Sequence, residues 1–241
     1  MQYVVALNRS VFCYYKSAAM LFIGLFIFEL FILYMLSRNI YVLFFKLFYR
    51  LTGDKNISIH LLAFLFLPGT LLHEAAHWLA AVILFVPAKS MTLVPKMEGQ
   101  SLRLGSVSIA KTDIIRRLII GAAPIILGVS IILAMLYFAF SNNIVNNYLI
   151  VFLLGYLVFE IGNTMFSSKK DMEGAVSLAL AVLVTSFIFY FLGQRIVFSG
   201  VMEFLYHPIL VDIFRRGTLY LFIPILIDLF FILILKPVYT R

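Results

Sequence analysis

Two histidines and a glutamate form a segment of the sequence with the spacing of a metal-dependent hydrolase: His73-Glu74-Ala75-Ala76-His77. Positions i and i+4 of an α-helix lie on the same face, so both imidazoles can reach one cation. Two neutral nitrogens and a carboxylate hold Zn²⁺ in an open site, whose fourth position carries a water with a pKa lowered to about 7. Glu74 would then take a proton from that water and pass it to the leaving amine. The spacing predicts one Zn²⁺ per chain.

The surroundings of this segment favour a metal site over simple packing. It lies within an apolar run, 57–86, and ionisable groups inside a membrane usually have a partner and a function because they are costly to insert. A chance occurrence of the pattern is expected in roughly one in several hundred chains of this composition. The alternative is that His73 and His77 are buried, hydrogen-bonded residues of a helix bundle.

A site with two histidines needs a third ligand, and the acids of the apolar segments supply the candidates. They are Glu29, Glu160, Asp171, Glu173 and Asp228. We prefer Asp171, because it follows a break in an apolar run at 167–170, and non-helical backbone at membrane depth is tolerated where it lines a cavity. An Asp before an apolar run is also a common helix N-cap. Glu160 is the competing ligand.

The composition indicates an integral membrane protein, since 63% of the 241 residues are hydrophobic, only 12% are charged and the mean hydropathy is +1.06. A soluble domain has about half apolar and about a quarter charged residues. At about 20 apolar residues per span, we predict an all-α polytopic fold with about six transmembrane helices. The predicted spans are residues 18–36, 57–86, 114–140, 148–165, 174–192 and 218–235.

The segments between the spans carry further predictions. Residues 38–51 mix charged and apolar side chains, which predicts an interfacial helix or a helical extension of the first span. Residues 194–217 are similarly mixed, which predicts an interfacial or partly inserted segment. The run 57–86 is too long for one straight span, so we expect a tilt, a kink or two pieces near Pro68-Gly69. Short alternating stretches in 87–112 predict a small membrane-associated β-hairpin, and Asp113 is placed to cap the helix that follows.

The charge of +8 is assigned to loops at the membrane surface and not to a nucleic-acid partner. Distribution of Lys and Arg over alternate loops places both termini in the cytoplasm, in a multi-pass protein of a cell membrane that we take to be prokaryotic. The single cysteine, Cys13, excludes an intramolecular disulfide and a cysteine-based zinc knuckle. One integral membrane domain, 1–241, accounts for the whole chain.

Three motifs in this order resemble those of the site-2 protease family of intramembrane zinc metalloproteases. The segment His73 to His77 resembles the family's HExxH helix, and Gly121-Ala122-Ala123-Pro124 looks like its Gly-Pro element, which opens the helix after a β-rich stretch. Residues 163–171, Asn163-Thr164-Met165-Phe166-Ser167-Ser168-Lys169-Lys170-Asp171, resemble its Asn-x-x-Pro-x-x-x-Leu-Asp-Gly motif. The sequence departs from the family at Ala76, where Gly is usual, at the missing Pro of the last motif, and at Met172, where Gly would follow.

By this resemblance, His73, His77 and Asp171 are zinc ligands, Glu74 is the catalytic base, and Asn163 lies near the substrate or the oxyanion. The metalloprotease-like core would be 57–174, with additional membrane helices in 18–51 and 175–241. A regulatory domain such as a PDZ domain does not fit within the chain, so a distant, minimal member would select substrates itself or through a membrane partner. Asn163 has an equally plain alternative as an amide that bonds between helices.

The implied activity is hydrolysis of peptide bonds in membrane-embedded proteins. A hairpin with a free edge would let an unwound substrate add as a strand. Two alternatives stay open: a membrane zinc hydrolase that acts on a lipid ester or amide, and a non-enzymatic transporter or scaffold that uses the acids as an ion relay. A free-edged hairpin near the metal would favour a peptide substrate over a lipid.

Overall fold

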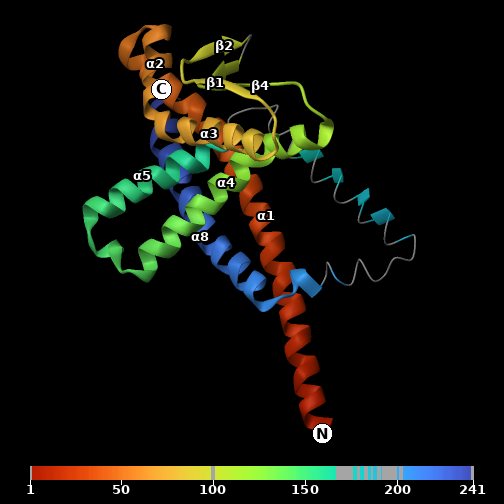
Figure 1. Ribbon diagram of the computed structural model, residues 1–241. Coiled ribbons are helices and arrows are strands. Elements are labelled where there is room, and N and C mark those ends of the chain that lie inside the picture. The colour runs from red at the N-terminus through yellow and green to blue at the C-terminus, as the bar shows by residue number, and fades with distance from the viewer. Residues whose placement is uncertain are drawn as a thin grey trace.

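The computed structural model describes residues 2–98, 101–166 and 203–239, with isolated helical residues between 176 and 200. Most of the described chain is helical (Figure 1). The helices are α1 (Gln2–Thr52), α2 (Lys55–Leu65), α3 (Leu67–Ile83), α4 (Ile114–Ser141), α5 (Tyr148–Thr164) and α8 (Pro208–Leu235), with short 3-10 turns η1 (Ile144–Asn146) and η2 (Lys236–Tyr239). The strands are β1 (Ala88–Thr92), β2 (Lys96–Glu98), β3 (Ser101–Arg103) and β4 (Ser106–Ile109).

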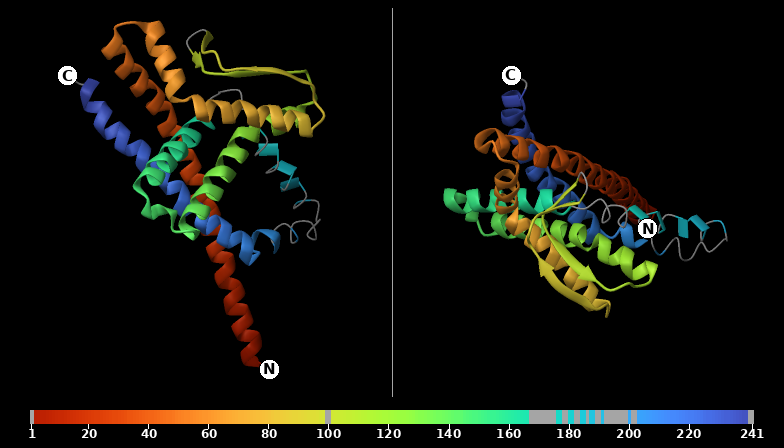
Figure 2. Two further views of the ribbon diagram at one scale, coloured as in Figure 1. Left: turned by 60° about the vertical axis from the view of Figure 1, so that its left-hand side comes forward. Right: turned by 90° about the horizontal axis from the view of Figure 1, so that it is seen from above.

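The helices form a bundle in which α1 and α8 run side by side, while α3, α4 and α5 pack against one another. The N-terminal end of α1 projects beyond the rest of the described molecule, and β1 and β4 lie along α3 (Figure 2). An aromatic cluster joins these layers. Phe66 is fully buried between Phe44 of α1 and Phe159 of α5, with ring centroids 6.1 and 5.7 Å away, and Leu104 of the β element inserts into the same cluster.

Three described helical segments are long and apolar enough to cross a membrane: 18–52 of α1, α4 and α8. The bent pair of α2 and α3 makes a fourth if the two helices count as one span. The described residues thus show a largely helical membrane protein with a small β element, and the six predicted spans are not shown. Helix α5 is a shorter apolar helix, and much of the predicted span 174–192 lies outside the described residues.

Charged segments next to the first and last predicted spans belong to long helices. Helix α1 continues without a break through 38–51, which confirms the helical extension. Buried Ile40 and Phe44 extend its apolar face, while Arg38 lies exposed and donates to Tyr34 Oη at 3.0 Å. Residues 208–217, predicted as part of an interfacial or partly inserted segment that ends before the last span, are instead the first turns of α8.

The charges at the start of α8 are compatible with a continuous helix because they pair along one exposed face. Asp212 bonds to Arg215 at 2.6 Å and to Arg216 at 2.7 Å, at helical spacings of three and four residues. Such pairs support a helix rather than end it. Mixed composition in this part of the sequence therefore reflects a helix with one polar face.

The predicted hairpin, helix cap and helix break are confirmed. Residues 88–109 form two antiparallel pairs, β1 with β4 and β2 with β3, and the β2–β3 pair lies between β1 and β4 in the sequence. Asp113 Oδ1 accepts from the backbone N–H of Arg116 at 3.0 Å, and this bond holds the pKa of Asp113 below its ordinary value. Helices α2 and α3 meet at Phe66 with a bend of 69°, and Pro68 lies in the first turn of α3.

Candidate metal centre

The His-Glu-x-x-His segment occupies the middle of α3, and its three polar side chains are buried. His73, Glu74 and His77 are exposed to only 4%, 5% and 8%. The two imidazole rings lie on one face of the helix, with centroids 4.8 Å apart and planes at 87°. Two nitrogen donors on adjacent turns of one helix fit a shared cation, which is the donor chemistry that zinc requires.

A hydrogen bond from outside α3 orients His77. Its Nδ1 lies 2.9 Å from the backbone carbonyl oxygen of Ile120, in the second turn of α4. Because a carbonyl only accepts, Nδ1 carries the proton in this contact, and the lone pair of the neutral ring is on Nε2. A metal-ligating histidine is commonly fixed in this way through its other ring nitrogen.

The carbonyl of Ile120 is available to His77 because of Pro124. In an α-helix each carbonyl accepts from the N–H four residues later, and the residue four after Ile120 is Pro124, which has no N–H. The proline lies inside α4 and is buried. The proline of the Gly121–Pro124 element thus leaves an acceptor on α4 at the position where the second histidine of α3 donates.

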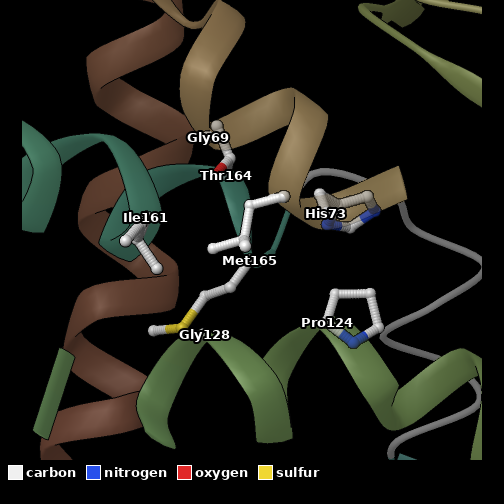
Figure 3. A pocket seen from close by; sticks show the side chains of 8 residues that line it. Gly69, His73, Pro124, Gly128, Ile161, Thr164 and Met165 are labelled. Atoms are coloured by element: carbon white, nitrogen blue, oxygen red, sulfur yellow. The ribbon is translucent and has the colours of Figure 1, made fainter. Parts of the chain in front are cut away.

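His73 borders a small cavity between α3, α4 and α5 (Figure 3). The other lining residues are Gly69, Leu72, Pro124, Gly128, Ile161, Thr164 and Met165. In Figure 3, His73 lies above Pro124, and Met165 approaches the same space from the end of α5. The cavity offers about 10 Å³ to the centre of a water molecule, which is close to the room that one water needs.

The β element approaches the site at Glu74. A Cβ on Gly105, just before β4, would lie 2.9 Å from Glu74 Cγ, 3.1 Å from Glu74 Oε1 and 3.0 Å from Thr70 Cγ2. Only glycine allows the backbone to come this close. The carbonyl of Gly105 also accepts from Arg103 Nε at 3.0 Å, and Leu104 is anchored in the aromatic cluster. The backbone at Gly105 therefore forms one wall of the site, next to Glu74, and its neighbours Arg103 and Leu104 fix its position.

The acid and amide of α5 considered for the site have other partners. Asn163 donates to Asp228 Oδ1 of α8 at 2.7 Å and to the carbonyl of Phe159 at 2.9 Å. All of Asn163, Asp228 and Glu160 are fully buried. Glu160 Oε2 accepts from the backbone N–H of Gly69 at 3.4 Å. In this arrangement the amide of Asn163 joins α5 to α8, as the interhelical alternative expected.

The preferred third ligand, Asp171, lies outside the described residues. Among the described residues, no group of three His, Cys, Asp or Glu side chains is placed to hold a metal ion, so Glu160 is not brought together with both histidines. Met165 lines the cavity beside His73, and Asp171 is the sixth residue after it in the sequence. Six residues span at most about 20 Å, so a return of Asp171 to the histidines is within the reach of the chain.

Reasoning from the sequence did not find the roles of Ile120 and Gly105. The Ile120 carbonyl had a signal in the sequence, because a proline inside a predicted helix always frees the acceptor four residues before it. Gly105 had none, since its contact with Glu74 depends on how the hairpin folds back over α3.

No family model matches the chain, and no curated protein or solved structure matches it either. The resemblance to the site-2 protease family consequently rests on the three sequence motifs alone.

Proposed function

We propose that the chain is a zinc-dependent intramembrane endopeptidase. The observation that carries this proposal is the pair His73 and His77, buried on one face of α3 with Nδ1 of His77 held by the Ile120 carbonyl. A structural histidine pair in a bundle needs only hydrogen bonds. A ligand pair needs one ring nitrogen directed away from its hydrogen-bonding partner, and the tautomer of His77 supports that arrangement.

The roles of the residues follow from their positions. His73, His77 and Asp171 would hold Zn²⁺, which would supply a Lewis acid that activates water. Glu74, adjacent to His73 in sequence and shielded by Gly105, would accept the proton and deliver it to the leaving nitrogen. The buried surroundings exclude bulk water, which strengthens the interaction of Glu74 with developing charge. Asn163 stays a candidate for the oxyanion only if its bond to Asp228 opens.

The β element supports a peptide substrate over a lipid. Strands β1 and β4 both contact α3, and they form a two-stranded ladder. Each strand of such a pair has one edge without a described strand beside it. An unwound segment of a membrane protein can add to such an edge, exchanging helical hydrogen bonds for those of a sheet. A lipid ester gains nothing from a strand edge.

Metal content and cleavage test the proposal. Purified protein is expected to hold one zinc per chain, and His73→Ala or His77→Ala should abolish that binding. Glu74→Gln should keep zinc and lose cleavage of a co-expressed single-span membrane protein. The matched control is His60→Ala, because His60 lies exposed on α2 and contacts the Asn56 carbonyl. Wild-type protein without stoichiometric metal would refute the proposal.

A further inference from the structure

The bend between α2 and α3 interrupts one turn of what would otherwise be a single helix. In an unbroken helix the N–H of Gly69 would donate to the carbonyl of Leu65, four residues earlier. Here each of these two groups has a partner on α5. Gly69 N donates to Glu160 Oε2 at 3.4 Å, and Tyr156 Oη donates to the carbonyl of Leu65 at 2.9 Å.

The two partners are four residues apart on α5 and therefore share one face of that helix. Tyr156 meets the last carbonyl of α2, and Glu160 meets an N–H in the first turn of α3, so one helix face satisfies both halves of a single missing hydrogen bond. Backbone groups at membrane depth need such partners because water does not supply them. Pro68 blocks the neighbouring helical bond, since it has no N–H.

The next residue on the same face of α5 fixes the crossing of the helices. A Cβ on Gly69 would collide with the side chain of Thr164 and would lie 2.7 Å from the carbonyl oxygen of Glu160. Figure 3 shows Gly69 directly against Thr164. The first turn of α3 is thus pressed onto α5, and His73 follows one turn later on the same face as Gly69.

We propose that Tyr156 and Glu160 are positioning residues that take over both halves of the Leu65–Gly69 hydrogen bond and thereby hold α3 at its angle to α2. They act through the direction of α3, which places His73 and His77 against α4. The link to metal binding rests on the proposed function, whereas the control of the bend does not.

A distance measurement across the bend tests this inference. Nitroxide labels at Ile57 and Ile83, both exposed, would report the angle by double electron–electron resonance in full-length protein carrying Cys13→Ser. With a rise of about 1.5 Å per residue, the two Cα atoms are about 33 Å apart at the observed bend and about 39 Å apart in a straight helix. A shift of about 6 Å is within the reach of the method.

The variants separate a positioning role from general destabilisation. Tyr156→Phe and Glu160→Leu should each broaden the distribution towards longer distances, and the double variant should shift it furthest. Glu160→Gln should keep the wild-type distance because its amide oxygen still accepts from Gly69. The matched control is Asp228→Leu, which removes an equally buried carboxylate on α8 and should leave the distance unchanged.

The outcomes distinguish the two proposals. If the double variant keeps the wild-type distance distribution, the positioning role is refuted. If Asp228→Leu shifts the distance as much as Glu160→Leu, the effect belongs to buried carboxylates in general, and the positioning role is likewise refuted. In zinc-competition titrations the double variant should bind zinc at least about tenfold more weakly. Wild-type protein that binds no zinc would refute the metal site. The distance measurement would still test whether Tyr156 and Glu160 hold the angle between α2 and α3.

Discussion

Replacing Gly105 with alanine should separate proton transfer from metal binding. The new methyl group would lie 2.9 Å from Glu74 Cγ and 3.1 Å from Glu74 Oε1, whereas ordinary contacts begin at about 3.4 Å. Gly105 does not have a positive φ, so alanine imposes no backbone strain there. Leu104 anchors the neighbouring backbone in the aromatic cluster, so the side chains of Glu74 and Thr70 are the parts that must move.

The expected magnitude follows from that distance. Relief of the contact needs a displacement of about 0.5 Å at Glu74 Cγ, which carries the attached carboxylate with it. Misplacement of a catalytic group by about 1 Å costs about 100-fold in rate, so half of that distance should cost about tenfold. A tenfold loss of kcat corresponds to about 1.4 kcal/mol in the activation barrier. Zinc affinity should change less than about twofold, because both histidines keep their positions on α3.

The assay compares kcat for cleavage of a membrane substrate in detergent micelles with the zinc affinity of the same samples. Gly155→Ala is the control, since its Cβ would have no atom within 4 Å. Adding Thr70→Ser to Gly105→Ala removes the methyl group 3.0 Å from the new Cβ and should restore part of kcat. Unchanged kcat in Gly105→Ala, or an equal loss of kcat and zinc binding, would refute the assignment of Gly105 to the position of Glu74.

Three further changes have defined outcomes. Pro124→Ala restores an N–H that competes with His77 for the Ile120 carbonyl. Zinc affinity, measured by competition, should fall by about tenfold, which is within the usual range for loss of a hydrogen-bonding partner of a metal ligand. An unchanged affinity would contradict the role of the proline. Gly69→Ala overpacks α3 against the backbone of Glu160 and should lower the free energy of unfolding by about 1–3 kcal/mol. Thermal unfolding in micelles measures this loss. A variant as stable as the wild type would contradict the close contact between α3 and α5. Because the pKa of Asp113 is lowered in the folded protein, its contribution to the stability of the fold is complete above the unfolded pKa of about 3.9 and is lost as the pH falls through the folded pKa. Asp113→Asn should remove this acid-dependent loss of stability. A variant whose thermal stability follows pH as in the wild type would contradict the role of the cap.

Elements with local causes were predictable from the sequence. Asp113 marks the start of α4 because an N-cap needs only a side chain and an N–H three residues away. The alternation in 88–109 sufficed for a hairpin, and Pro68 within a long apolar run sufficed for the break near it. The spacing of His73 and His77 placed both rings on one face because the helix period alone sets that relation.

Features with distant causes were not predictable. Asn163 pairs with Asp228, 65 residues away, and a motif position says nothing about which helix packs on that face. A second miss had a local cause. The charges in 208–217 favoured an interfacial or partly inserted segment, but Asp212 pairs with Arg216 four residues later and the helix stays regular. Composition alone did not show that this pairing keeps the charged stretch continuous with the last span, so the start of that helix was misplaced.

The proline of α4 and the histidine of α3 constrain each other's replacement over evolutionary time. Loss of His77 alone leaves an apolar core with an unfilled carbonyl at Ile120, and loss of Pro124 alone gives that carbonyl two competing donors. Each single change thus leaves one buried polar group without its native partner, whereas the double change to a regular helix with an apolar residue in place of the histidine leaves none. Descendants of this sequence should therefore keep the two residues or lose them together, although 47 positions of chain separate them.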